Sequence, residues 1–219
     1  MIDKYDIPYE WYNNLCTTGT LPTKEDIMRT VGNRCGCLDI NAFRCKDLYN
    51  SKFGFALLSQ ETVNDMAKFF DGCTVLEVGA GSGFLAKAIS DANISIKMIA
   101  TDSGEWENSC KDEWKKHFSD VLIMDGIDAI SAFADNIDYV LMSWPPYDES
   151  MAYEILNKCI EVNKPLVYIG EWECGCNGDN EFFELINKEC DVYFDTVTEN
   201  YVPFGFLYDD VYLIKGKGA

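Results

Sequence analysis

Apolar residues follow two regular patterns along most of the chain. From Ser59 onward, short apolar runs rich in Val, Ile and Leu alternate with stretches whose apolar residues recur at helical spacing. The runs predict strands at 73–79, 94–102, 121–125, 137–144 and 165–172. The stretches predict helices at 60–70, 83–92, 107–118, 126–133, 149–160 and 179–189. This strand–helix alternation predicts an α/β fold whose parallel sheet is covered by helices on both faces.

The two ends of the chain depart from this alternation. Residues 1–57 read as short irregular elements, apart from a helix near 24–31 that begins after the N-cap residue Thr23. Residues 191–214 alternate as two paired strands joined by a turn around Pro203 and Gly205. We therefore predict an N-terminal extension or cap at 1–57 and one domain at 58–219. Its sheet is doubly wound, mostly parallel and seven-stranded, with an antiparallel C-terminal hairpin.

Composition and charge exclude several classes of protein. Hydrophobic residues make up 47% of the chain and aromatic residues 14%, which excludes global disorder. No apolar run approaches the roughly 18 residues that span a bilayer, and the polar start MIDKYDIPYEWY is not a secretory signal. We expect a cytoplasmic protein without a membrane partner. The net charge of -19 makes a long DNA duplex an unfavourable partner.

Basic residues and cysteines cluster near the N-terminus. Residues 29–52 contain all three arginines (Arg29, Arg34 and Arg44) and carry a local net charge of +3. This segment is either an anion-binding surface or a basic loop neutralised by acidic neighbours. A zinc site is an alternative to free thiols for four cysteines, although their spacing is not a usual zinc motif, so we predict no metal. These are Cys16, Cys35, Cys37 and Cys45.

A glycine-rich turn follows the first predicted strand. Gly79, Gly81 and Gly83 allow the backbone to adopt positive φ and to approach a ligand closely. A dinucleotide fingerprint would place its last glycine at Phe84, so the spacing disfavours NAD or FAD. Glu77, two residues before the first glycine, would repel a pyrophosphate and attract a cationic ligand.

The sequence from Glu77 to Gly83, EVGAGSG, resembles motif I of class I S-adenosylmethionine-dependent methyltransferases. The resemblance extends in strand order over about 59–215 and implies a Rossmann-like methyltransferase fold with S-adenosyl-L-methionine as cofactor. It implies that Asp102 holds the ribose hydroxyls and that Asp125 and Gly126 lie near the adenine. The cofactor-binding residues implied are Glu77, Gly79, Gly81, Gly83, Asp102, Asp125, Gly126 and Ser143.

The fourth predicted strand ends in Ser143-Trp144-Pro145-Pro146-Tyr147. Two prolines remove two backbone donors, and Tyr147 can stack on a flat group. The segment resembles the (D/N/S)-P-P-(Y/F) motif of amino-methyltransferases, which implies catalytic roles for Trp144, Pro145, Pro146 and Tyr147. Trp144 occupies the position of the hydrogen-bond acceptor, yet an indole only donates. Ser143 should point to the opposite face of the strand unless the strand end is bulged. The alternative is a rigid turn without chemistry.

Two further groups of residues are candidates for the site. Glu171 and Trp172 end the fifth predicted strand, where they bind substrate or form a solvated strand end. Phe53 and Phe55 precede the first regular helix and are predicted to be core residues. The resemblance implies instead that their segment closes over the cofactor.

The function predicted from these residues is methyl transfer to an amino nitrogen. The acceptor, which the sequence does not specify, is a nucleobase, nucleotide or RNA, a protein side chain or a small amine. The alternative is a catalytically silent protein of the same fold whose acidic surface binds a partner. The glycine spacing disfavours an oxidoreductase, and His117, the one histidine, is not predicted to be catalytic.

Overall fold

The computed structural model describes residues 7–32, 39–105, 117–173 and 175–218 of the chain. Seven strands form one sheet in the order β3-β2-β1-β4-β5-β7-β6, and only β7 is antiparallel to its neighbours. The predicted doubly wound sheet with an antiparallel C-terminal pair is therefore confirmed. The strands are β1 (Thr74–Val78), β2 (Lys97–Asp102), β3 (Val121–Ile123), β4 (Tyr139–Ser143), β5 (Leu166–Glu171), β6 (Cys190–Tyr193) and β7 (Asp209–Gly216).

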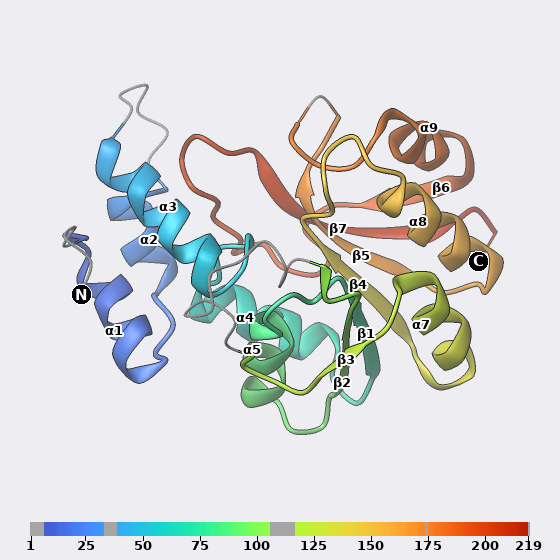
Figure 1. Cartoon of the computed structure of the whole chain (residues 1–219), viewed down its shortest axis with the longest axis horizontal. Coiled ribbons are helices and arrows are strands. Elements are labelled where there is room, and N and C mark those ends of the chain that lie inside the picture. Colours follow the sequence, from blue (N-terminus) through green and yellow to red (C-terminus); the bar gives the residue numbers. More distant parts are fainter. Residues whose placement is uncertain (1–6, 33–38, 106–116, 174, 219) are drawn as a thin grey trace.

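Helices cover both faces of this sheet (Figure 1). On one face lie α4 (Gln60–Phe69) and α5 (Phe84–Ala92). On the other lie α7 (Gly126–Phe133), α8 (Met151–Glu161) and α9 (Asn180–Glu189), with a short 3-10 helix, η2 (Ala134–Asn136), after α7. Strand alternation divides the buried residues into two cores. Val75 packs in the α4/α5 core, whereas Leu76 and Val78 pack in the α7–α9 core.

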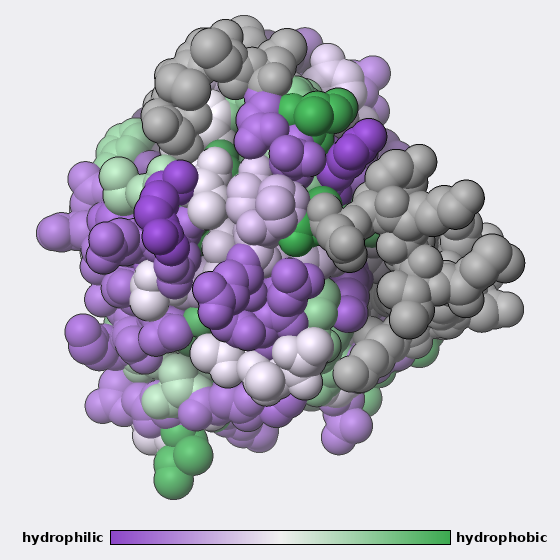
Figure 2. Space-filling view, turned by 90° about the vertical axis from the view of Figure 1, so that its left-hand side faces the viewer, coloured by the Kyte–Doolittle hydropathy of each residue, from purple (hydrophilic) through white to green (hydrophobic). Residues whose placement is uncertain are grey.

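Three helices form the N-terminal part of the chain: α1 (Glu10–Thr18), α2 (Lys24–Thr30) and α3 (Ile40–Lys52). The expectation of irregular structure outside 24–31 was therefore wrong. Helix α3 buries only Ala42, Cys45 and Tyr49, which make a weak apolar stripe. The outer side of these helices is largely hydrophilic (Figure 2), and their buried residues join the α4/α5 core. The division into 1–57 and 58–219 stays a prediction.

The connection between β6 and β7 is longer than the predicted hairpin turn. Residues 194–208 leave the sheet and reach the N-terminal helices, so Pro203 and Gly205 lie within a long loop (Figure 1). Phe206 stacks on Phe43 of α3 with ring centroids 4.0 Å apart. The carboxylate of Asp65 on α4 accepts hydrogen bonds from the side chains of Thr198 and Asn200. These contacts hold the loop over the α4/α5 face of the sheet.

None of the helices in the described ranges has the length and apolar character needed to cross a membrane.

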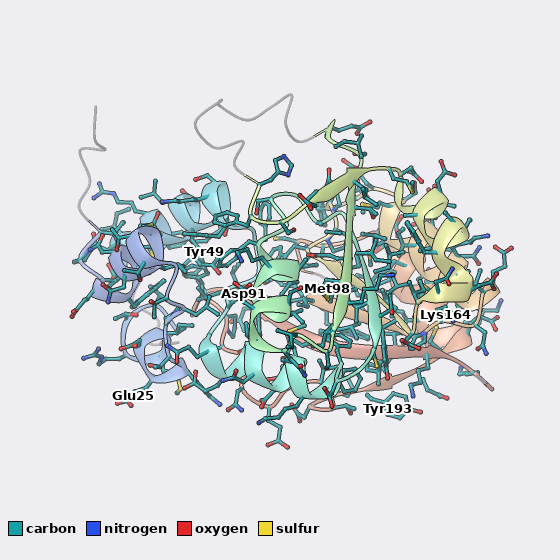
Figure 3. All side chains as sticks on the ribbon, turned by 90° about the horizontal axis from the view of Figure 1, so that it is seen from below. Glu25, Tyr49, Asp91, Met98, Lys164 and Tyr193 are labelled. Carbon is teal, nitrogen blue, oxygen red and sulfur yellow. The ribbon has the colours of Figure 1, made fainter. Side chains whose placement is uncertain are left out.

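Tyr49 joins α3 to the segment that leads into α4. Its ring is fully buried and lies between the N-terminal helices and the sheet (Figure 3). Its hydroxyl donates to the carbonyl of Ala56 and accepts from the backbone N–H of Leu58, both at 3.1 Å. One hydroxyl therefore satisfies two buried backbone groups.

Replacing Tyr49→Phe removes that hydroxyl and leaves the Ala56 and Leu58 groups unsatisfied. We expect the free energy of unfolding to fall by about 1–3 kcal/mol, measured by urea denaturation. Tyr193→Phe, at an exposed position on β6, is the matched control and should change stability by less than about 0.5 kcal/mol. Equal stability of the two variants would contradict the bridging role of Tyr49.

Candidate functional site

A row of polar residues lies on the α4/α5 face of the sheet, where the parallel strands end. The strand register and side-chain alternation place one such residue on each of five strands. In sheet order they are Asp102 (β2), Glu77 (β1), Ser143 (β4), Glu171 (β5) and Asp209 (β7). All four carboxylates are buried. Because burying charge is costly without partners, this row marks the candidate site.

The glycine turn between β1 and α5 adopts the conformation that its sequence predicts. Gly79, Gly81 and Gly83 have φ values of 65°, 52° and 71°. A Cβ at Gly81 would meet no atom within 4 Å. At Gly79 it would approach the methyl group of Met151, and at Gly83 the side chain of Ser119. The turn is therefore packed at both ends and open at Gly81.

Asp102 fastens this turn to the end of β2. Its Oδ2 accepts a hydrogen bond from the N–H of Gly81, and its Oδ1 accepts one from the N–H of Gly104, both at 2.8 Å. A carboxylate oxygen accepts more than one hydrogen bond, so Asp102 retains acceptor capacity beside the open part of the turn.

Glu77 lies beneath the same turn with only 2% of its surface exposed. Its Oε2 has no hydrogen-bond partner among the described residues, and the backbone N–H of Ala86 donates to its carboxyl group. Burial, and secondarily the charge of Asp102, raise the pKa of Glu77 to about 8. A cationic ligand would relieve this penalty by favouring the ionised form.

Asp125 and Gly126 lie after β3, as the resemblance implies. Asp125 is exposed and caps α7, since its Oδ1 accepts from the N–H of Ile127 at 2.8 Å. A Cβ at Gly126 would lie 2.6 Å from the side chain of Ile155 on α8. A larger residue here would therefore displace the end of the Ile155 side chain, and a contact of either Asp125 or Gly126 with adenine stays a prediction.

Trp144 leaves β4 in a left-handed conformation, with φ of 51°. Its backbone N–H still donates to the carbonyl of Ile169 at 2.7 Å, so the ladder continues into the turn. Its ring packs against the α4/α5 core and stacks on Phe55, with centroids 5.9 Å apart. The change of φ, rather than a bulge, thus brings Trp144 to the face on which alternation places Ser143.

The rest of this turn is divided between buried and exposed residues. Pro145 is buried, and its carbonyl accepts from the side-chain amide of buried Asn177 at 3.1 Å. Pro146 is exposed, and Tyr147 is 66% exposed beside Gly178, with which it forms a β-bridge. Tyr147 is therefore free of core packing, whereas the Pro145 carbonyl is bound within the protein.

Glu171 and Trp172 lie on opposite faces of the sheet. The two carboxylate oxygens of Glu171 accept from the N–H groups of Tyr208, at 2.9 Å, and Cys176, at 2.8 Å, so Glu171 organises two loops. Trp172 packs on the α7–α9 side, with its ring centroid 4.7 Å from that of Tyr212. Because they face opposite sides, the two residues do not line one shared surface. Their role in substrate binding stays a prediction.

Phe53 and Phe55 differ in how far they are buried. Phe53 is buried as predicted, but Phe55 is 53% exposed, so its assignment to the core was wrong. Its ring has a partner in Trp144 instead of a place in the core, because the Trp144 conformation brings the indole to the edge of the sheet.

Asp209, at the start of β7, belongs to the site and was missed by the sequence analysis. Its Oδ2 accepts from the indole Nε1 of Trp144 at 3.2 Å and from the hydroxyl of Tyr201. Its Oδ1 has no partner among the described residues. Burial above all, opposed by these donors, raises the pKa of Asp209 to about 6. The sequence could have indicated it, because Asp209 lies two and four residues before Val211 and Leu213, whose side chains face the α4/α5 core, and therefore shares their face of the strand.

The other N-terminal candidates lie apart from this row. Within the described ranges, no three His, Cys, Asp or Glu residues are placed to hold a metal ion. Cys16 and Cys45 are free thiols, and burial raises the pKa of Cys45 to about 12. Cys35, Cys37 and Arg34 lie outside the described residues. Arg29 forms an ion pair with Asp26 at 3.0 Å, so an anion-binding role for 29–52 stays a prediction.

Comparison with known proteins gives matches only among solved structures. No protein-family model matches, and no curated protein matches. The chain is similar to the plantazolicin methyltransferase BpumL in complex with SAH, at 15% identity and a TM-score of 0.48 over 82% of this chain and 91% of that one. It is also similar to the mitomycin 7-O-methyltransferase MmcR, at 16% identity and a TM-score of 0.48 over 95% and 68%.

A third similar structure is cofactor-bound Rv0187 from MTB, at 10% identity and a TM-score of 0.49 over 83% of this chain and 92% of that one. All three identities are 16% or lower and all three TM-scores are below 0.5, so these matches do not define the chemistry of the site.

The pKa of Glu77 makes stability depend on pH in a defined direction. Since the folded state holds this proton up to about pH 8, whereas the unfolded state releases it near 4.5, stability should fall as pH rises between these values. One pKa unit corresponds to about 1.4 kcal/mol. Glu77→Gln should flatten the pH dependence of the unfolding midpoint. Glu184→Gln, at an exposed position on α9, should leave it unchanged, and equal profiles for both variants would contradict the assignment.

Proposed function

We propose that this protein is an S-adenosyl-L-methionine-dependent methyltransferase acting on an amino nitrogen. The observation that carries the proposal is the unpartnered, buried oxygen of Glu77 beneath a glycine turn that is open at Gly81. A buried carboxylate oxygen without a partner is unfavourable in the empty protein and favourable next to a cation. The motif at Glu77–Gly83 is the one that the resemblance associates with such a cofactor.

The residues around the turn fit this cofactor in charge and space. Glu77 would face its positively charged end, and the open backbone at Gly81 would lie against it. Asp102 would accept hydrogen bonds from the ribose hydroxyls with its remaining capacity, while Asp125 and Gly126 would border the adenine. When bound, the cofactor supplies a methyl group on a sulfonium. No phosphate is involved, which agrees with two carboxylates at the turn.

The acceptor would bind beside the Trp144–Tyr147 turn. Tyr147 offers an exposed ring for stacking, and the turn lies at the carboxyl end of β4, next to β1 and the glycine turn. Methyl transfer chiefly requires positioning of the two reactants. We propose an amino nitrogen of a nucleobase, nucleotide or RNA, a protein side chain or a small amine as acceptor. A long DNA duplex is disfavoured by the net charge of -19, and we propose a cytoplasmic location.

Gly81→Ala tests the cofactor site. Alanine at position 81 would have to keep the left-handed conformation of Gly81, at a cost of about 1–2 kcal/mol. Its Cβ would also fill the open part of the turn. We expect calorimetry to show loss of S-adenosylhomocysteine binding. Gly72→Ala is the matched control, since Gly72 has φ of 73° and equally open surroundings. It lies just before β1, at the opposite end of that strand from the glycine turn. Retained binding by Gly81→Ala would refute the cofactor site.

Tyr147→Ala tests the acceptor side of the site. Because Tyr147 is mostly exposed, we expect the unfolding midpoint and S-adenosylhomocysteine binding to be unchanged. Transfer of labelled methyl groups from the cofactor into fractionated RNA, DNA, protein and metabolites should be abolished. Tyr193→Ala, at another exposed tyrosine, should keep the activity. Full activity of Tyr147→Ala would show that this ring has no part in catalysis.

The same assay separates the proposed function from its alternative. Cofactor binding by the wild-type protein, without transfer into any fraction, would indicate a catalytically silent protein of this fold that binds partners.

A further inference from the structure

The conformation of Trp144 depends on Asp209. A residue with a Cβ pays about 1–2 kcal/mol for a left-handed conformation and keeps it only where the surroundings enforce it. Here the indole donates to Asp209 Oδ2 and stacks on Phe55, while Tyr201 donates to the same oxygen. Asp209 is thus the centre to which both donors point.

This structural role does not explain why a charged side chain is buried at position 209. One carboxylate oxygen accepts both donors, and the other, Oδ1, is buried without a partner among the described residues. Asp209 is 3% exposed, and its register partner in β5 is Glu171, a second buried carboxylate. A buried like-charge pair destabilises the empty protein. An amide at position 209 would serve the two donors at lower cost, so the charge itself requires a reason.

The surroundings indicate which ligand would balance this charge. Neither Glu171 nor Asp209 forms an ion pair within the described part of the chain. The ring of Trp144 borders Asp209, with Phe55 stacked on it, and Tyr147 follows three residues later. Carboxylates combined with aromatic faces attract organic cations, through charge and through cation–π contacts. They repel phosphates and carboxylates.

We propose that Asp209 is the acceptor-recognition group of this site, whose free Oδ1 receives a hydrogen bond from the charged nitrogen of an arylalkylamine. This proposal rests on the proposed methyltransferase function and narrows its acceptor to an amine that binds as a cation and bears a flat apolar group. Before transfer the ammonium would give one proton to Oδ1 of Asp209, which would free the nitrogen lone pair to attack the sulfonium methyl, and the cofactor would leave as S-adenosylhomocysteine. Asp209 supplies the hydrogen-bond acceptor that the Trp144-Pro145-Pro146 sequence lacks. Trp144 therefore serves as a wall of the site and as a donor that orients Asp209.

In this proposal Phe55 is the movable part of the site. It stacks on the ring of Trp144 and is half exposed. The preceding Gly54 has φ of 135°, and a Cβ there would meet no atom within 4 Å. The ligand reaches Oδ1 when the Phe55 ring moves off Trp144. The flat group of the amine then takes the place of the Phe55 ring in the stack.

Fluorine NMR titration tests the proposal with three probes of one shape and different charge. They are para-fluorophenethylamine, para-fluorophenylethanol and para-fluorophenylacetate, added to the protein with and without saturating S-adenosylhomocysteine. We expect the amine to bind at least about tenfold more tightly than the alcohol, because a charge-assisted hydrogen bond is stronger than a neutral one. The acetate should bind most weakly. This series needs no variant and so does not depend on how any variant folds.

Asp209→Asn assigns the preference to one residue. It should weaken amine binding about tenfold, leave alcohol binding unchanged and keep the calorimetric affinity for S-adenosylhomocysteine. Asp210→Asn, which removes the same charge from the neighbouring position on the opposite face of β7, is the matched control and should keep amine binding.

Three results would overturn the proposal: no amine binding at millimolar concentration, equal binding of amine and alcohol, or equal effects of Asp209→Asn and Asp210→Asn. Failure of S-adenosylhomocysteine to bind the wild type would refute the proposed function instead. The titration without cofactor would still report whether Asp209 holds the amine.

Discussion

The burial of four carboxylates along one face of the sheet is the constraint on which the rest of the site depends. Charge in a protein interior must be hydrogen-bonded, paired or neutralised. Asp102 and Glu171 meet this requirement with backbone N–H groups from the turns and loops around them. Glu77 and Asp209 do not, since each keeps one buried oxygen without a partner in the described structure. Asp102 and Glu171 thus hold the surrounding loops in place, whereas Glu77 and Asp209 each keep one oxygen that can still accept a hydrogen bond.

The position of these two incomplete groups divides the site into halves. Glu77 lies on β1 beneath the glycine turn, and Asp209 lies on β7, with β4 and β5 between them. The Trp144 turn leaves β4 and joins the halves, because its indole contacts Asp209 while its strand pairs directly with β1. Because β4 pairs with neighbours on both sides, it would hold the two proposed ligands at a fixed separation.

The half of the site around Asp209 is surrounded by parts of the chain outside the regular α/β pattern. Loop 194–208 carries Tyr201 to Asp209 and stacks Phe206 on α3. Tyr49 ties α3 to the segment that ends near Phe55 and Leu58. The N-terminal helices and the long loop therefore stabilise each other, and together they place the groups that surround Trp144.

The sheet, the alternating order of its strands and helices, and the glycine turn could be predicted from sequence because they depend on local signals. Apolar periodicity separates strands from helices, and a glycine at each left-handed position of the turn is visible directly. Glu77 and Asp102 could be recognised as candidates because Glu77 lies just before the glycine turn and Asp102 ends a predicted strand. Helices α1 and α3 escaped prediction because their buried stripes are short and partly polar.

The sequence by itself thus determined the α/β fold and the half of the candidate site around the glycine turn, from Glu77 to Asp102. Only the tertiary structure decided the half around Asp209. Asp209 meets Trp144 across 65 positions of sequence, and Glu171 and Trp172 separate to opposite faces because neighbours on a strand alternate. Contacts of this kind arise from strand pairing and loop packing, which leave no periodic pattern for a sequence reading to detect.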